Sequence, residues 1–206
     1  MRLILYLLFV SLSFIFLRCS STHLLNSSTR DYMPLAIGNK WFYNIHGSNV
    51  KGSSEISIIR EIIATDTIEG KKYFKIKYEN VNSNLPPNYY YQRNSNDTLY
   101  TLNYDEKRNK YIERVTAIFN LNSNETADVE LNIDEITPKN KIEKLPTMNK
   151  YSIKVIKKEG DTIELHTYRG AIDLNHTEIY KRGIGMVESK NDWGIVSQLI
   201  DYNLNN

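Results

Sequence analysis

The sequence has few of the residues that build disulfides and metal sites. Cys19 is its one cysteine, so no disulfide can form within the chain. The four histidines lack the spacing of zinc ligands; they are His23, His46, His166 and His176. We therefore expect no metal site and no cofactor, and the single cysteine needs a different explanation.

Long hydrophobic runs are also missing from the sequence. The longest one, from Leu3 to Leu17, has about 15 residues and lies between Arg2 and Arg18. A membrane-spanning helix needs about 18 or more apolar residues, whereas the apolar part of an export signal has about 7–15. The run therefore predicts a signal peptide over residues 1–18 that is removed after export.

An excess of basic charge is absent from the part of the chain that follows the signal. Subtracting Arg2 and Arg18 from the 26 basic residues leaves 24, which equals the 24 acidic residues. Nonspecific affinity for nucleic acid comes from clustered positive charge. We therefore expect no nucleic-acid partner.

Catalytic motifs are the last notable absence. The sequence contains no Gly-x-Ser-x-Gly elbow, no phosphate-binding glycine loop, no His-Glu-x-x-His and no Cys-x-x-Cys. Acidic neighbours such as Asp134 and Glu135 point to opposite faces of an extended strand, which separates their carboxylates. We predict no catalytic residues and no enzyme activity, and an envelope hydrolase is the least favoured function.

What is present after residue 32 is the two-residue alternation of β-strands. Phe74, Ile76 and Tyr78 share one face of an expected strand, and the run Ala127 to Ile133 alternates most regularly. Gly160, in a Glu-Gly-Asp turn between two alternating runs, predicts a hairpin. No segment after the signal has the 3.6-residue period of a helix.

The strand candidates predict an all-β fold in a single domain over residues 32–206. We expect an antiparallel meander of about ten strands, curved into an open barrel or packed as two sheets. The second strand is expected to start near Glu55, with the turn after it over Asp66 to Gly70. The segment Asp134 to Asn149 is expected to be a long surface loop, with a lid as the alternative.

Tyrosine is unusually frequent, with 15 residues against two tryptophans. Tyrosine suits half-buried strands, because its ring packs against neighbours while its hydroxyl reaches water. We expect Tyr89, Tyr90 and Tyr91 to cover both faces of one strand. A stacking surface for a carbohydrate or lipid is the alternative.

Cys19 directly follows the predicted signal and precedes a polar Ser/Thr-rich segment. This arrangement resembles the lipobox of bacterial lipoproteins, although Arg18 and Phe16 replace its usual small residue and Leu. The resemblance implies that Cys19 is lipidated, that residues 19–31 form a polar tether, and that two acyl chains hold the protein to a membrane. The alternatives are secretion after cleavage behind Ser21, and an uncleaved anchor.

Two short motifs bracket the expected domain. The first has the form Pro-Leu-x-x-Gly-Asn-x-Trp-x-Tyr, and its residues are Pro34, Leu35, Gly38, Asn39, Trp41 and Tyr43. The second, near the end of the chain, is Gly183-Ile184-Gly185-Met186-Val187. Together they resemble a family of bacterial envelope lipoproteins of unknown function, whose closing motif is Gly-Val-Gly-hydrophobic-Val. The resemblance implies a β-rich envelope domain and supplies no catalytic residues.

Each motif also has a structural interpretation. Trp41 is expected to be a buried anchor of the first strand, which follows a tight turn at Gly38 and Asn39. Gly183 and Gly185 leave one strand face without side chains, which indicates a bulge or bend of the sheet. A portal for a ligand is the alternative at these two glycines.

These observations favour an exported, lipid-anchored, non-enzymatic binding domain of the cell envelope, at the outer membrane or cell surface. A secreted or periplasmic location is the alternative. A lipid or lipoprotein carrier would need an apolar cavity, with Phe74, Ile76, Val129 and Leu131 as the expected lining. A surface module would instead bind another envelope protein through aromatic patches or strand edges.

Lipidation of Cys19 predicts how the protein fractionates. Cys19→Ser removes the sulfur that carries the lipid, so the variant should move from the membrane to the soluble fraction, because the two acyl chains supply the anchoring energy. Immunoblots of fractionated cells measure the change, with Ser20→Ala as the control. A Cys19→Ser protein that stays with the membrane would show that lipidation is not the anchor.

Overall fold

The computed structural model describes residues 32–47, 52, 54–106, 109–130, 150–168 and 175–205. Cys19, the signal and tether, Leu131 and the expected loop over 134–149 lie outside these residues. Within the described part, none of the helices has the length and apolar character needed to cross a membrane.

The described residues form one twelve-stranded antiparallel sheet. Its strands are β1 (Lys40–Gly47), β2 (Ile58–Ile68), β3 (Lys71–Asn80), β4 (Asn88–Ser95), β5 (Thr98–Asp105), β6 (Lys110–Ile118), β7 (Thr126–Glu130), β8 (Lys150–Glu159), β9 (Thr162–Tyr168), β10 (His176–Lys181), β11 (Gly185–Asn191) and β12 (Ile195–Asn203). The predicted all-β meander is confirmed, with two more strands than the approximate count expected from the sequence.

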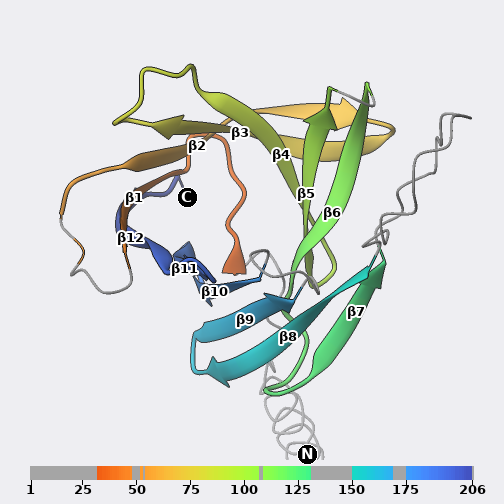
Figure 1. The fold of residues 1–206 in the computed structure, drawn as a ribbon. Coiled ribbons are helices and arrows are strands. Elements are labelled where there is room, and N and C mark those ends of the chain that lie inside the picture. The colour runs from red at the N-terminus through yellow and green to blue at the C-terminus, as the bar shows by residue number, and fades with distance from the viewer. Residues whose placement is uncertain are drawn as a thin grey trace, which may run out of the picture.

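The strand order is β6-β5-β4-β3-β2-β1-β12-β11-β10-β9-β8-β7. Strands that follow one another in the chain therefore pair as hairpins within each half, and β1 pairs with β12 to join the halves. The sheet curls into a nearly closed barrel whose free edges are β6 and β7 (Figure 1). Near this gap the Tyr151 hydroxyl, from β8, donates a hydrogen bond to the Val115 carbonyl of β6.

Both boundaries of the second strand differ from the sequence-based expectation, which put its start near Glu55 and its end before Asp66. β2 starts at Ile58 and continues to Ile68, so the predicted turn over Asp66 to Gly70 shrinks to Glu69 and Gly70. The error arose because Asp66 and Thr67 are typical turn residues, yet here they pair with β3 in a regular ladder. The predicted hairpin at Gly160 is confirmed between β8 and β9.

The segment before β1 runs through the middle of the barrel in Figure 1. The Tyr32 side chain is fully buried and its ring stacks on Phe119, with 5.0 Å between the ring centroids. The side-chain amide of Asn94 donates to the Met33 carbonyl at 2.9 Å, and the backbone amide of Gly38 donates to the Ile62 carbonyl at 2.7 Å. These contacts fix the segment against the interior of the sheet.

The two sequence motifs meet beside the β1–β12 pairing. Trp41 Nε1 donates to the Ile184 carbonyl at 2.6 Å, and the Tyr43 hydroxyl donates to the Met186 carbonyl at 3.0 Å. Both rings are buried, as expected for Trp41. Since these bonds join the start and the end of the barrel, we call Trp41, Tyr43 and the backbone of 184–186 the clasp.

Gly185 is required by the close packing of the clasp. Its φ is +112°, a conformation that side-chain-bearing residues rarely adopt. A Cβ atom there would lie 3.1 Å from Trp41 Nε1 and 3.4 Å from Met33 Sδ. Gly183 instead lies in the exposed turn between β10 and β11, so the motif forms a turn and a strand start rather than the continuous strand expected.

The clasp predicts a specific loss of stability. Trp41→Phe deletes the hydrogen bond to the Ile184 carbonyl and should lower the unfolding free energy by about 1–2 kcal/mol. Trp41→Ala also leaves a cavity and should cost about 3–5 kcal/mol. Urea unfolding monitored by circular dichroism measures both changes.

The second tryptophan of the chain supplies the matched control. Trp193 is 67% exposed in the turn before β12, so Trp193→Ala should change the unfolding free energy by less than about 0.5 kcal/mol. Equal effects of the two alanine variants would contradict the role given to Trp41.

Candidate functional site

Two cavities among the described residues of the barrel are candidates for a functional site. The larger, about 590 Å³, includes four of the motif residues singled out in the sequence, and we call it the Pro34 cavity. Its lining is Pro34, Leu35, Ala36, Asn39, Lys72, Phe74, Arg93, Asn94, Gly183, Leu204 and Asn205. The remaining motif residues do not line it: Trp41, Tyr43 and Gly185 belong to the clasp, and the Gly38 backbone amide donates to the Ile62 carbonyl.

Several polar residues that line the Pro34 cavity form hydrogen bonds between the start and the end of the domain. Asn39 Nδ2 donates to the Pro34 carbonyl at 2.7 Å, and the Asn39 side-chain oxygen accepts from the Asn205 amide at 2.8 Å. The Asn205 side chain donates to the Ile37 carbonyl at 3.0 Å. Asn39 and the Pro34 carbonyl therefore have structural partners that account for them without a ligand.

The smaller cavity, about 230 Å³, lies between the two halves of the barrel, and we call it the Arg60 cavity. Residues of β2, β4, β5 and β6 face residues of β9 and β10 across it. The lining is Arg60, Tyr90, Gln92, Thr101, Asn103, Arg114, Val115, Thr116, Thr167, His176, Glu178 and Tyr180. All of these except Val115 carry a polar group, so the barrel holds a polar chamber beside an apolar core.

Arg60 occupies one wall of this cavity. Its guanidinium carbon lies 5.1 Å from the centroid of the Tyr43 ring and 5.8 Å from that of Tyr78, a cation–π arrangement. Its Nη1 atom contacts Met186 Sδ at 3.9 Å, a weak acceptor. Its Nε atom is inaccessible to solvent and has no hydrogen-bond partner within the described part of the chain.

A second wall is formed by β4, β5 and β6. The Gln92 amide donates to Thr101 Oγ1 at 3.1 Å, and the Thr116 hydroxyl donates to the same oxygen at 2.6 Å. Gln92 Oε1 is buried and accepts no hydrogen bond from any described residue. This wall therefore offers an unsatisfied acceptor in the same cavity as the unsatisfied donor of Arg60.

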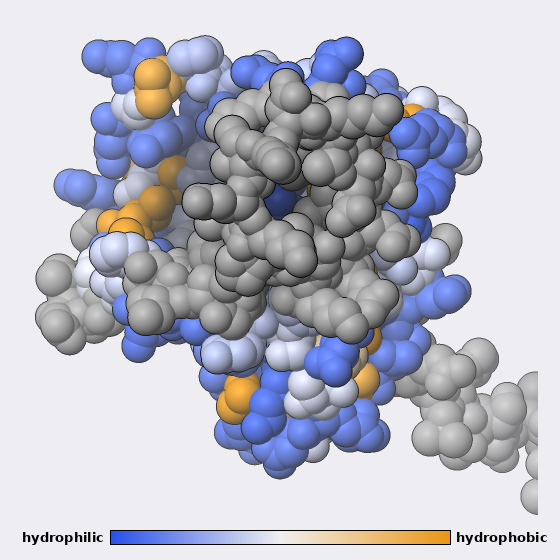
Figure 2. Space-filling view, turned by 45° about the vertical axis from the view of Figure 1, so that its right-hand side comes forward, coloured by the Kyte–Doolittle hydropathy of each residue, from blue (hydrophilic) through white to orange (hydrophobic). Residues whose placement is uncertain are grey.

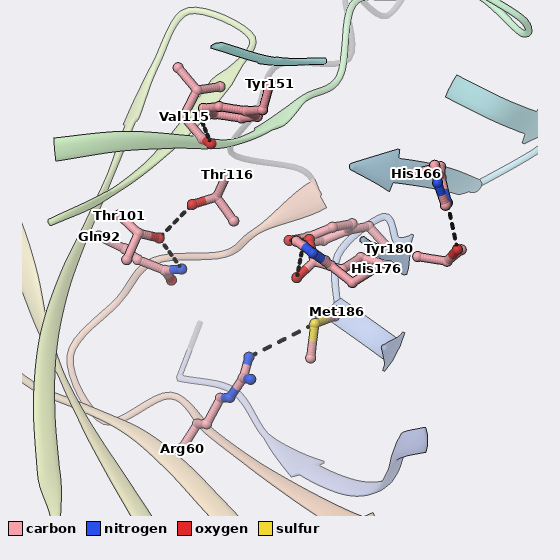
Figure 3. Close-up of polar contacts among 12 residues, drawn as sticks. Arg60, Gln92, Thr101, Val115, Thr116, Tyr151, His166, His176, Tyr180 and Met186 are labelled. Carbon is pink, nitrogen blue, oxygen red and sulfur yellow. Dashed lines mark hydrogen bonds and ion pairs between the residues drawn. The ribbon is translucent and has the colours of Figure 1, made fainter. Parts of the chain in front are cut away.

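The third wall carries the cavity's carboxylate. Glu178 Oε2 accepts a hydrogen bond from the Tyr180 hydroxyl at 2.9 Å, and Glu178 Oε1 lies 3.7 Å from His176 Nε2. Figure 3 shows Tyr180 and His176 on one side, Gln92, Thr101 and Thr116 on another, and Arg60 with Met186 below. Glu178 thus has partners of its own, whereas Arg60 contacts no carboxylate among the described residues.

The tyrosines around Arg60 are neutral donors. Burial raises the pKa of Tyr43, Tyr90 and Tyr180 above the ordinary tyrosine value, and the nearby Arg60 charge only partly opposes this. Their hydroxyl groups therefore keep their protons at physiological pH. Consequently these rings do not neutralise the charge of Arg60.

Sequence reasoning did not identify Arg60, Gln92 or Glu178. One signal was available for Arg60, because it alternates with Ile58 and Ile62, which are 2% and 0% exposed. A charged residue at the middle position of a buried strand face indicates a polar group in the interior. Nothing comparable marks Gln92 or Glu178, whose strands alternate less regularly.

The residues expected to line an apolar carrier cavity do not come together around one. Ile76 and Val129 are buried in the packed core, at 1% and 8% exposure, and line neither cavity. Phe74 lines the Pro34 cavity beside the cation of Lys72. Leu131 is outside the described residues.

The consecutive tyrosines cover both faces of β4, as predicted. Tyr90 lines the Arg60 cavity, while Tyr89 and Tyr91 lie on the outer face near Lys75 Nζ, at 5.2 and 5.9 Å from their ring centroids. The Tyr111 ring packs edge-on against Tyr91. Figure 2 shows another view of the exterior as mostly hydrophilic, with only small hydrophobic patches outside the grey atoms.

An ion-pair cluster lies on the sheet formed by β3, β4 and β6. Glu113 accepts hydrogen bonds from Arg93 Nε at 2.7 Å, from Lys71 Nζ at 3.1 Å, and from the Tyr73 hydroxyl. Burial alone would raise the pKa of Glu113, but these three donors outweigh it and lower the pKa to about 2. Arg93 therefore forms an ion pair with a carboxylate, whereas no such ion pair is present for Arg60 among the described residues.

Among the described residues, no group of three or more His, Cys, Asp and Glu side chains is placed to bind a metal ion. The hydroxyls of Thr101 and Thr116 bond to each other and to Gln92, rather than to a histidine or carboxylate. An activated nucleophile requires a base in hydrogen-bond reach. The geometry of the Arg60 cavity therefore suits recognition by hydrogen bonds and charge.

Comparisons with known proteins give a distant likeness in fold. No family model and no curated protein matches the chain. A solved structure from Bacteroides fragilis, described as a candidate exported protein with a YmcC-like fold, has 11% identity and a TM-score of 0.46, covering 84% of this chain and 99% of that one. A candidate lipoprotein from Parabacteroides distasonis has 11% identity and a TM-score of 0.39, covering 84% and 98%. No part of the site is assigned from either likeness.

The Glu113 cluster predicts a pH-dependent contribution to stability. Because the pKa of Glu113 is lowered by folding, its stabilisation is present above about pH 4.5 and disappears as the pH falls towards 2. Glu113→Gln should therefore lower the unfolding free energy by about 1–2 kcal/mol at pH 7. The difference from the unmodified protein should shrink between pH 4.5 and 2.

Urea unfolding at a series of pH values measures this difference. Asp192→Asn, an exposed change in the turn between β11 and β12, serves as the control and should cost less than about 0.5 kcal/mol at pH 7. A Glu113→Gln difference that stays constant down to pH 2 would contradict the assignment.

Proposed function

We propose that this chain is an exported, lipid-anchored, non-enzymatic domain that binds a small polar ligand of the cell envelope in the Arg60 cavity. The predicted export signal and the lipobox-like position of Cys19 support its location, and the resemblance of the two bracketing motifs supports an envelope lipoprotein. The observation that carries the binding role is the polar chamber itself, whose walls come from both halves of the barrel.

The energetic argument starts from the cost of polar groups in a protein interior. A buried donor or acceptor without a partner costs about 1–3 kcal/mol, and an unpaired charge costs more. Arg60 Nε and Gln92 Oε1 are two such atoms in one chamber. A polar ligand that pairs with both atoms would remove this cost, which supports a binding role for the cavity.

The lining also selects among the other candidate functions. An acyl chain has no polar atoms to pair with Arg60 or Gln92, so a lipid carrier is less favoured than a receptor for a polar molecule. Hydrolysis is less favoured because the Thr101 and Thr116 hydroxyls have no adjacent base in the described part of the cavity.

A protein-binding role has its own supporting observation. On the outer face of the sheet, Tyr89, Tyr104 and Tyr111 are 52%, 49% and 37% exposed, and exposed aromatic rings are typical of interfaces. The Tyr104 and Tyr111 rings also pack against each other at 5.2 Å. An envelope protein that bound here would bury these rings and leave the Arg60 cavity unaffected.

Native mass spectrometry of the protein purified from its own envelope distinguishes these roles. We expect a bound small molecule that is retained in Tyr104→Ala and lost in Gln92→Leu, which removes one polar wall. The melting temperature of each variant verifies that it is folded. Absence of a small molecule from the unmodified protein, or its retention in folded Gln92→Leu, would contradict the proposal, and a protein partner lost only in Tyr104→Ala would favour the surface role.

A further inference from the structure

The incomplete hydrogen bonding of the Arg60 guanidinium indicates the chemical class of the ligand. We propose that the Arg60 cavity recognises a small polyhydroxylated carboxylate of the sugar-acid class, whose carboxylate binds the Arg60 guanidinium. This inference rests on the proposed function and makes it specific. It is argued below from the geometry of the guanidinium, the charges of the cavity, and the size and polarity of its walls.

The surroundings of Arg60 leave its hydrogen-bonding edge available. The Tyr43 and Tyr78 rings contact the guanidinium by cation–π interactions, which use the face of a ring and none of the five N–H donors. Of those donors, Nη1 contacts only the Met186 sulfur and Nε contacts nothing within hydrogen-bond distance among the described residues. A planar fork of this kind matches a carboxylate, which accepts two parallel hydrogen bonds.

Arg93 provides a comparison, because its guanidinium forms hydrogen bonds to a carboxylate within the protein. Arg93 makes two hydrogen bonds to the Glu113 carboxylate, at 2.7 and 3.1 Å, and its guanidinium also lies 4.0 Å from the Tyr100 ring centroid. Arg60 has the aromatic contacts, but no carboxylate among the described residues forms an ion pair or hydrogen bond with it, although the charge of nearby Glu178 stabilises the guanidinium. The missing element is therefore the group that we assign to the ligand.

The charges that line the cavity favour a single negative charge on the ligand. Arg60 and Arg114 are cationic, Glu178 is a carboxylate that already bonds Tyr180, and His176 lies beside it. His176 aside, two arginines against one carboxylate give the lining a formal charge of +1, so a monoanion balances it, whereas a phosphate dianion would exceed it and be repelled about twice as strongly by Glu178. A carboxylate is therefore preferred to a phosphate ester.

The remaining walls describe the rest of the ligand. Gln92 Oε1 requires a donor. The Thr101 oxygen already accepts two hydrogen bonds and keeps its proton to donate, whereas the Thr116 hydroxyl already donates to Thr101 and can only accept. A body with several hydroxyl groups satisfies both needs. The volume of about 230 Å³ is below the range of about 300–1,000 Å³ that is typical of drug-sized ligands, so a single sugar unit is the appropriate size.

Isothermal titration of the full mature chain with glucuronate and with glucose tests the inference directly, because the two sugars differ in the carboxylate. We expect glucuronate to bind at least about tenfold more tightly than glucose, since hydrogen bonds to a charged group contribute tenfold or more. Arg60→Gln should weaken glucuronate by at least about tenfold and leave glucose unchanged. Lys75→Gln, which removes an outer-face cation, should change neither.

A second measurement keeps the test independent of the folding of the Arg60 variant. In the unmodified protein, glucuronate should bind more tightly than glucose 6-phosphate and more tightly than glutamate, which carries carboxylates without a sugar body. Folding of Arg60→Gln and of the milder Arg60→Lys is verified by melting temperature. A folded Arg60→Gln that binds glucuronate normally would overturn the assignment of Arg60.

The outcomes also separate this inference from the proposed function. Equal binding of glucose and glucuronate, or tighter binding of the phosphate ester or the amino acid, would overturn the sugar-acid assignment and retain a polar-ligand receptor. A ligand of another class recovered from the envelope, with no glucuronate binding, would also overturn the sugar-acid assignment and retain a polar-ligand receptor. Absence of binding by all four probes, and of any ligand in the envelope preparation, would overturn both.

Discussion

The pairing of β1 with β12 supports the whole barrel, because it is the strand pairing that joins the two halves of the described sheet. Among the described strands, the other pairings are hairpins between neighbours in the chain, whereas Trp41 and Tyr202 are brought together from opposite ends. Closing so long a loop costs chain entropy before any contact compensates. The clasp supplies that compensation, since Trp41 and Tyr43 bury two large rings and also bond to the backbone of β11 and the turn before it.

The segment from Tyr32 to Asn39 strengthens the same closure from inside. Tyr32 stacks on Phe119, at the end of the first half, and Phe119 in turn packs edge-on against Tyr180 of the second half, at 5.1 Å. An apolar stack therefore spans the interior near the β6–β7 gap, where the sheet has no ladder hydrogen bonds. The barrel is held at one side by backbone pairing and at the other by packed aromatic rings.

Strand alternation in the sequence was enough to predict the fold class and most of the hairpins. The Arg60 cavity could not be predicted in this way, because it combines residues such as Arg60, Gln92 and Glu178 that are far apart in the chain. Alternation gives the face of a strand, but not which faces meet across a barrel. Register shifts between Ile62 and Ala64 and between Leu99 and Tyr100 add to the difficulty, since each changes which later residues face inward.

The bracketing motifs were visible in the sequence, and their interpretation as turn and anchor agrees with their contacts, yet the same contacts also position the candidate site. Tyr43 donates to the Met186 carbonyl, and its ring lies against the guanidinium of Arg60. Met186, on the other side of the clasp, contacts Arg60 through its sulfur. Arg60 is therefore held by β1 and β11 at once, and these strands are neighbours of β12 on either side. Because the guanidinium of Arg60 is oriented by the residues that close the barrel, barrel closure and the proposed ligand binding would depend on one set of contacts.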